Sequence, residues 1–150
     1  MLNVFKKEIM AELSGYVLFF GILVAIGMQV YSIMKIQGLY RQIKGVIQSR
    51  QDLGAVKEVI NLNMKLAIFY FVLAGIIMLM VIILIVNGMP GRGFTMLFIF
   101  GIVTLPAGLI GKHFEKKIKS LSVESSDKEI AKTYERYLIQ WKEARFKLPD

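Results

Sequence analysis

Residues 66–86 read LAIFYFVLAGIIMLMVIILIV, a run of 21 residues that contains no charge and only one polar side-chain group, the Tyr70 hydroxyl. A helix of this length covers roughly 30 Å, which matches the hydrocarbon core of a bilayer. The run is apolar on every side, and a helix in a soluble core needs only one apolar face. We therefore predict that residues 66–86 cross a membrane.

Two further uncharged runs lie on either side of it. Residues 15–34 read GYVLFFGILVAIGMQVYSIM, and residues 93–111 read GFTMLFIFGIVTLPAGLIG. Residues 15–34 are too long for a signal peptide and lack a small-x-small cleavage site, so they are interpreted as the first membrane span. Pro106 in the third run cannot donate to the Ile102 carbonyl and is expected to kink that helix. The predicted fold class is an all-α integral membrane protein with three transmembrane helices.

The connection between the second and third spans is short. Residues 87–92 read NGMPGR, and this content of glycine and proline is typical of a tight turn. The two spans are therefore predicted to form an antiparallel hairpin.

Composition and charge narrow the function classes. The chain has 150 residues, is 55% hydrophobic and carries a formal net charge of +8. Its basic residues flank the apolar runs, which indicates a membrane rather than nucleic acid as the partner. The chain has no cysteine, so a disulfide framework, thiol catalysis and cysteine-ligated metals are excluded.

Lysine and arginine counts predict the orientation. Residues 1–14 contain 2 and residues 87–92 contain 1, whereas residues 35–65 contain 6 and residues 112–150 contain 10. Cytoplasmic flanks carry the excess of these residues. We therefore expect an N-terminus outside and a cytoplasmic loop and tail, in a bacterial inner membrane. Residues 1–14 are either an interfacial helix on the outer surface or the start of the first span.

The loop of residues 35–65 has two apolar stripes at helical spacing. The stripes comprise Ile36, Leu39, Tyr40, Ile43, Val46 and Ile47, then Val56, Val59, Ile60 and Met64. Ser49 and Asp52 form a candidate capping box for the second stripe. The first helix is expected to reach about Arg50 and the second to begin near Asp52. The stripes either pair as a hairpin or lie flat on the inner leaflet.

A further amphipathic helix is predicted at residues 127–148, with Ser126 and Glu129 as its capping box. Its stripe supplies the candidate partner-docking residues Ile130, Tyr134, Tyr137, Leu138 and Trp141. Such a stripe must cover the loop hairpin, the membrane surface or a partner protein. Protein contact is favoured, because the acidic residues of the tail would be repelled by an anionic leaflet.

The spans contain no charged residue, although proton relays, ion-coupled transporters and voltage sensors place ionisable groups at that depth. The polar residues within the spans are expected to join helices by hydrogen bonds; they are Gln29, Ser32, Thr95 and Thr104. Thr104 and Pro106 are the candidate pore-lining residues. His113 is the only histidine, so we expect no metal or cofactor, and no catalytic motif points to an enzyme.

Small residues supply candidate helix-packing positions. Gly21 and Ala25 lie four residues apart in the first span, and Gly101 and Gly108 lie two turns apart in the third. Small residues let helix backbones approach closely. They serve either packing among the three helices or contact with another subunit.

The topology resembles that of the proton-motive-force stator family that includes the TolQ and ExbB proteins. The third span, with Thr104, Ala107, Gly108 and Leu109, is similar to the threonine-and-glycine segment of that family, although the first loop is much shorter here. Three spans and a charged inner tail also resemble class I phage holins. Both resemblances imply a homo-oligomeric pore or stator-like channel.

The function expected first is a non-catalytic subunit or scaffold of a larger membrane complex. Its partners would be membrane lipids and other membrane proteins or further copies of itself, docked through the glycine-containing spans and the aromatic tail helix. The alternative is the homo-oligomeric pore or stator-like channel.

Overall fold

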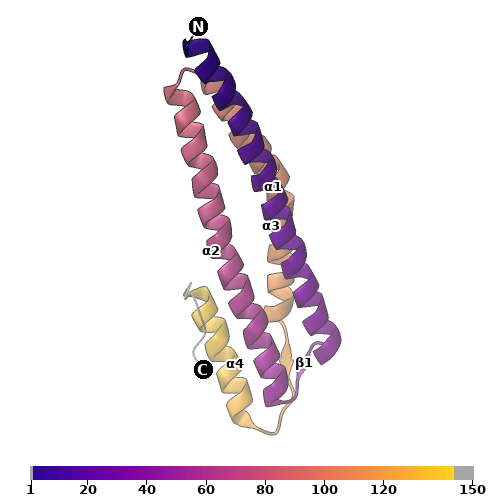
Figure 1. The fold of residues 1–150 in the computed structure, drawn as a ribbon. Coiled ribbons are helices and arrows are strands. Elements are labelled where there is room, and N and C mark those ends of the chain that lie inside the picture. Colours follow the sequence, from indigo (N-terminus) through magenta and orange to yellow (C-terminus); the bar gives the residue numbers. More distant parts are fainter. Residues whose placement is uncertain (1, 144–150) are drawn as a thin grey trace. The chain divides into compact units, whose positions relative to one another are not determined.

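The computed structural model describes residues 2–143, of which about 87% are helical (Figure 1). The elements in chain order are α1 (Leu2–Ile43), β1 (Val46–Ile47), α2 (Arg50–Val86), α3 (Pro90–Lys119), β2 (Ser122–Val123) and α4 (Lys128–Lys142). The last part of the helix predicted at residues 127–148 lies outside the described residues.

The three long helices α1, α2 and α3 are each long and apolar enough to cross a membrane. The most apolar windows of these helices reach mean hydropathies of 2.1, 3.1 and 2.1, and only 17%, 22% and 24% of their residues are buried. Helices in lipid need no water-soluble face, so this exposed apolar surface suits a bilayer. The prediction of an all-α protein with three membrane-spanning helices is confirmed to this extent.

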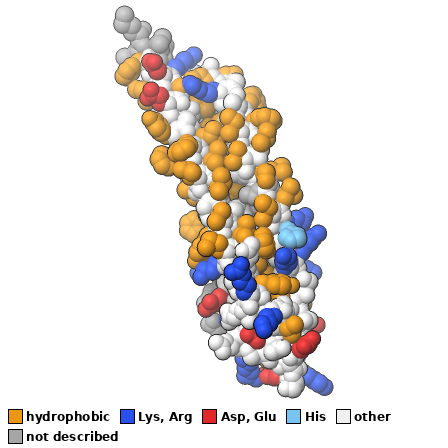
Figure 2. All heavy atoms as spheres, turned by 90° about the vertical axis from the view of Figure 1, so that its right-hand side faces the viewer, with side chains coloured by type: hydrophobic (Ala, Val, Ile, Leu, Met, Phe, Trp, Pro, Cys, Tyr) orange, Lys and Arg blue, Asp and Glu red, His pale blue; other side chains and the backbone are white. Residues whose placement is uncertain are grey.

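The chain divides into two compact units. The first, here called the apolar unit, comprises the chain up to Met28 together with Phe69–Leu109, and the second, the basic unit, comprises Gln29–Ile68 together with the chain from Ile110 onward. The apolar unit contains 3 of the 19 lysines and arginines, which leaves 16 in the basic unit. On the face that Figure 2 shows, hydrophobic side chains are numerous over the apolar unit.

In the apolar unit, the chain reverses direction between α2 and α3 at a glycine cap. Gly88 has a φ of +75°, and its N–H donates to the Ile85 carbonyl at 3.0 Å, while the Met89 N–H donates to the Leu84 carbonyl at 2.9 Å. This pair of bonds is a Schellman motif, which satisfies the last carbonyls of a helix. Pro90 then opens α3 at a position where a missing N–H costs nothing. The turn is therefore shorter than the predicted residues 87–92.

All three helices contribute to the core of the apolar unit. Its buried residues are Ile77, Met80, Val81 and Leu84 from α2, and Met96 and Phe100 from α3, with Val17, Leu18 and Ile22 of α1 packed against them. The rings of Tyr70 and Phe100 stack, with 6.3 Å between their centroids. A Cβ atom at Gly93 would lie 3.2 Å from the Val81 carbonyl oxygen, so the lack of a side chain there allows α2 and α3 to approach closely.

In the basic unit, α1 ends earlier than predicted. The helix stops at Ile43 rather than near Arg50, so that prediction was wrong. Lys44 and Gly45 follow with φ values of +49° and +83°, a left-handed conformation that terminates a helix. The next two residues, Val46 and Ile47, belong to a strand instead of continuing the helical stripe.

This strand, β1, pairs in parallel with β2, so that Val46 lies opposite Ser122 and Ile47 opposite Val123. The Ser122 N–H donates to the Gly45 carbonyl at 3.3 Å, and the Glu124 N–H donates to the Ile47 carbonyl at 3.1 Å. The Ile47 side chain is fully buried. The pairing therefore fixes the segment after α1 to the segment after α3.

The capping box predicted at the start of α2 is confirmed. The Ser49 N–H donates to Asp52 Oδ2 at 3.0 Å, and the Asp52 N–H donates to Ser49 Oγ at 3.2 Å. The Ser49 hydroxyl also donates to the carboxylate, and this bond is the largest cause of a pKa of Asp52 below its usual value. Two N–H groups that the helix leaves unpaired are thereby satisfied.

The cap predicted for α4 was wrong by one residue. Asp127, not Ser126, is the N-cap, because its carboxylate accepts from the Glu129 N–H at 3.0 Å. Asp127 also accepts from Arg50 Nη2 at 3.1 Å. The pKa of Asp127 is below its usual range. The largest cause is the hydrogen bond from the Glu129 N–H, and the hydrogen bond from the Arg50 guanidinium is the next. The cap therefore also links the first residue of α2 to the start of α4.

Candidate interaction surfaces

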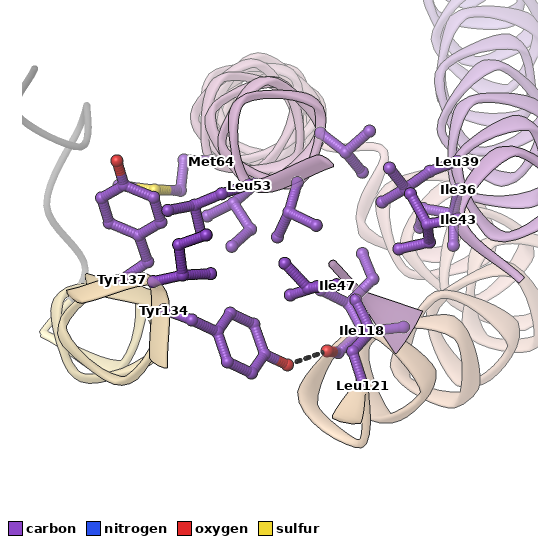
Figure 3. Packing of buried hydrophobic residues seen from close by; sticks show 14 residues of the cluster. Ile36, Leu39, Ile43, Ile47, Leu53, Met64, Ile118, Leu121, Tyr134 and Tyr137 are labelled. Atoms are coloured by element: carbon purple, nitrogen blue, oxygen red, sulfur yellow. Dashed lines mark hydrogen bonds between the residues drawn. The ribbon is translucent and has the colours of Figure 1, made fainter. Parts of the chain in front are cut away.

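The aromatic face of α4 is packed inside the basic unit. Ile130, Tyr134 and Tyr137 are buried, and Leu138 and Trp141 lie partly buried against the same cluster. In Figure 3 the two tyrosines lie among side chains from the other helices. These five candidate partner-docking residues thus cover the chain's own core. Docking through them stays a prediction.

The stripes of the loop at residues 35–65 form the other side of this core. Besides the three from α4, its buried members are Ile36, Leu39 and Ile43 of α1, Ile47 of β1, Leu53, Val56, Val59, Ile60 and Met64 of α2, Ile118 of α3 and Leu121. The structure thus has the protein packing expected of a loop hairpin, with α4 as a third layer. At about 25 cal/mol per Å² of apolar area removed from water, such burial is the main stabilising contribution.

Tyr134 makes the main polar contact of this core. Its hydroxyl donates to the backbone carbonyl of Ile118, and the side chain is 5% exposed (Figure 3). Burial raises the pKa of Tyr134 to about 12, because the phenolate would lose its hydration. The contact satisfies a carbonyl at the end of α3 and requires the neutral phenol.

The four candidate helix-packing residues fall into two pairs. Gly21 and Ala25 on α1 are buried, and a Cβ atom at Gly21 would lie 3.1 Å from the Ile77 Cδ1 atom of α2. Gly101 and Gly108 on α3 are exposed, and a Cβ atom at either would meet no described atom within 4 Å outside the helix backbone. The first pair serves internal packing, and the second pair lies on an open face.

A shallow groove surrounds Gly101 on α3. It is lined by Phe94, Thr95, Leu97, Phe98, Gly101, Ile102 and Leu105, and we call it the α3 groove. The groove arises because a residue without a side chain lies between bulky ones at helical spacing. It is apolar except for Thr95, whose hydroxyl donates to the Gly91 carbonyl at 2.9 Å.

Polar groups in the spans behave in two ways. The Ser32 hydroxyl of α1 donates to the Asn63 side chain of α2, so it joins two helices as predicted. The Thr104 hydroxyl donates to the Phe100 carbonyl of its own helix at 2.7 Å and is buried. Pro106 lies within α3 and is exposed. The pore-lining role of Thr104 and Pro106 stays a prediction.

Asn63 is the residue that sequence reasoning missed. It lies three residues before the apolar run of α2, and its amide also donates to the Val59 carbonyl at 3.1 Å. Ser32 lies two residues before the end of the first apolar run. Ser32 and Asn63 thus lie close to the ends of their apolar runs that face the loop between them. Antiparallel helices bring such residues to the same depth, so these positions could have indicated the contact.

The described part of the chain contains no group of three or more metal-ligating side chains. His113 is exposed, and its ring lies nearly perpendicular to that of Phe114, with 5.7 Å between the ring centroids. Compared with known proteins, the chain matches no family model, no curated protein and no solved structure.

Proposed function

We propose that the protein is a non-catalytic subunit of a larger membrane complex, which binds a helix of another membrane protein in the α3 groove. The observation that carries this proposal is the exposed position of Gly101 among Phe94, Phe98 and Leu105. The small residues Gly21, Ala25 and Gly93 are buried inside the chain, whereas the α3 groove has no occupant among the described residues.

A partner helix explains the groove better than lipid does. Glycine in a helix interior costs about 1 kcal/mol relative to alanine, and lipid chains would contact either residue equally well. A second helix gains from the missing side chain, because its backbone can approach closely enough for extensive van der Waals contact. The bulky side chains beside Gly101 would pack on both sides of that helix.

The orientation is part of the same proposal. The basic unit would lie in the cytoplasm and the N-terminus outside, in a bacterial inner membrane. The split of 3 against 16 lysines and arginines between the two units supports this orientation. The exposed α4 face, with Lys132, Glu135 and Arg136, would then be open to cytoplasmic proteins.

The alternative is a homo-oligomeric pore or stator-like channel with Thr104 and Pro106 beside the path. The groove supports it only in that two copies could pack through the same face. Thr104 gives it less support, because its hydroxyl is already bonded to Phe100 and its side chain is 6% exposed. We therefore rank the heteromeric complex first.

The test compares two glycines on exposed helix faces. Gly101→Leu fills the α3 groove, and Gly75→Leu makes the same change on α2, where a Cβ atom also meets no described atom within 4 Å. The tagged proteins would be purified from the native host in mild detergent and analysed by native mass spectrometry. Other membrane proteins should co-purify at fixed ratio with the wild type and Gly75→Leu, and be lost with Gly101→Leu.

Each alternative result has a definite meaning. A wild-type chain that purifies alone would contradict the proposal. A single discrete homo-oligomer, disrupted by Gly101→Leu, would favour the pore, and conductance of Thr104→Ala would then be measured.

A further inference from the structure

A small pocket of about 300 Å³ opens between α1 and α3 in the basic unit. Ile36, Gln37, Tyr40 and Arg41 line it from α1, and Phe114 and Lys117 line it from α3. Two cations from separate helices thus face one pocket, with aromatic and aliphatic side chains between them. No carboxylate is among these lining residues.

The Lys117 ammonium is held over two rings. Its Nζ atom lies 5.9 Å from the ring centroid of Tyr40 and 5.3 Å from that of Phe114. Such cation–π contacts favour one position of an otherwise flexible side chain. The pocket is therefore built with its positive charge already in place.

The charges of the pocket are not neutralised by ion pairs within the described residues. The nearby carboxylate of Glu115 pairs with Lys119, and Asp127 and Glu129 pair with Arg50. Neither Arg41 nor Lys117 pairs with a carboxylate in the described part of the chain. Both side chains are exposed, so their charges are open to an anion from outside the chain.

The sequence positions of these cations match the depth of lipid head groups. Lys35 and Lys112 are the first charges after their apolar runs. Arg41 follows Lys35 by six residues, roughly 9 Å along a helix, and Lys117 follows Lys112 by five, roughly 7.5 Å. Head groups occupy about 5–8 Å on each side of the hydrocarbon core, and long basic side chains reach back toward them.

We propose that this pocket binds the phosphate of an anionic lipid head group. The Arg41 guanidinium would donate two parallel hydrogen bonds to the phosphate, and Lys117 would supply a second point charge. Ile36 and Phe114 make part of the lining apolar, which suits the glycerol backbone of a lipid better than a free, fully hydrated anion. Further lysines and arginines gather around the single histidine in Figure 2 and would raise the local concentration of anionic lipid. The site is independent of the partner proposed for the α3 groove.

The test uses the full chain in mild detergent, titrated with short-chain phosphatidylglycerol and followed by native mass spectrometry. We expect one lipid to bind per chain, and binding to weaken at least tenfold in Arg41→Gln/Lys117→Gln. The matched control, Lys132→Gln/Arg136→Gln, removes the same two residue types from the exposed face of α4 and should bind within twofold of the wild type. Zwitterionic phosphatidylcholine should bind more weakly than phosphatidylglycerol to the wild type and the control, and this preference should be lost in the pocket variant.

Three results would overturn the proposal. They are undiminished binding by the pocket variant, equal weakening of the control, and preference for inorganic phosphate over phosphatidylglycerol, which would assign the pocket to a soluble anion. If the double variant fails to fold, judged by circular dichroism, the single variants Arg41→Gln and Lys117→Gln decide. Each should weaken binding about threefold, and unchanged binding by both would refute the site.

Discussion

The Tyr134 hydroxyl donates to the backbone carbonyl of Ile118, and this bond joins α4 to the end of α3. The phenol ring is buried in a core built from all four helices and β1. The same contact thus supplies a hydrogen bond and a large buried apolar surface. It makes α4 an integral layer of the basic unit, and its strength can be measured.

Replacing Tyr134 by phenylalanine should destabilise the basic unit by about 1 kcal/mol, because the Ile118 carbonyl loses the phenol and keeps the longer bond from the Leu121 N–H at 3.4 Å. Urea unfolding of the full chain in detergent, followed by Trp141 fluorescence, measures the loss. Tyr137→Phe is the matched control, since no hydrogen bond of the Tyr137 hydroxyl is seen among the described residues, and its effect should be smaller. Equal losses in the two variants would contradict the importance of the bond.

Alkaline pH should release α4. The pKa of Tyr134 is about 12 in the folded chain, against an ordinary value of 10.0. The folded state therefore favours the neutral phenol: this contribution is complete below pH 10 and is lost as the pH rises toward 12. Trp141 fluorescence from pH 9 to 12 should show the change in wild type. In Tyr134→Phe this component of the pH dependence should be absent. If the variant showed the same pH profile of Trp141 fluorescence as the wild type, the change could not be assigned to Tyr134.

Ser49→Ala should fray the start of α2 by about 1 kcal/mol, because the capping box loses its hydroxyl. Hydrogen exchange at the amides of Asp52 and Leu53 should become faster. The pKa of Asp52 is lowered, so the cap contributes above pH 3.8 and is lost as the pH falls through the lowered value. The control is Ser126→Ala, which should leave exchange in α4 unchanged since Asp127 is the cap there.

Gly88→Ala should destabilise the turn between α2 and α3 by about 1–2 kcal/mol, because an L side chain disfavours the left-handed conformation. Thermal unfolding in detergent, monitored by circular dichroism, gives the comparison. Gly91→Ala is the control: Gly91 lies in the first turn of α3, and a Cβ atom there meets no described atom within 4 Å. It should be neutral or slightly stabilising, and a loss at Gly91 as large as at Gly88 would refute the assignment to backbone conformation.

The features that could be predicted from the sequence depend on residues that are close together along the chain. The three spans follow from uncharged length, and the Ser49–Asp52 cap follows from two residues three apart, since both signals depend on neighbours along the chain. The cap of α4 was placed at Ser126 because Ser126 and Glu129 have the spacing of a capping box, yet the neighbouring Asp127 is the N-cap. Arg50 is 77 residues away from Asp127 and adds to its interactions, and sequence spacing cannot reveal such a partner.

Contacts between distant segments were the part that sequence could not supply. Val46 and Ile47 fit the helical stripe of the loop, yet they pair with Ser122 and Val123. A two-residue strand has no periodicity of its own, so only its partner identifies it. The pocket at Arg41 and Lys117 was missed for the same reason, because its two cations come from helices that are far apart in the chain.

The parallel pairing of β1 with β2 has a consequence for biogenesis. A ribosome releases Val46 and Ile47 before α2 and α3 have been made, so β1 must wait for its partner until the third span is complete. During that interval Ile47 lacks the part of its core that α3 and α4 supply, and the strand presents an unpaired edge. The two-strand bridge can thus close only after the whole of α3 has been synthesised. A chain arrested before β2 would keep this edge open to proteases and to other nascent strands.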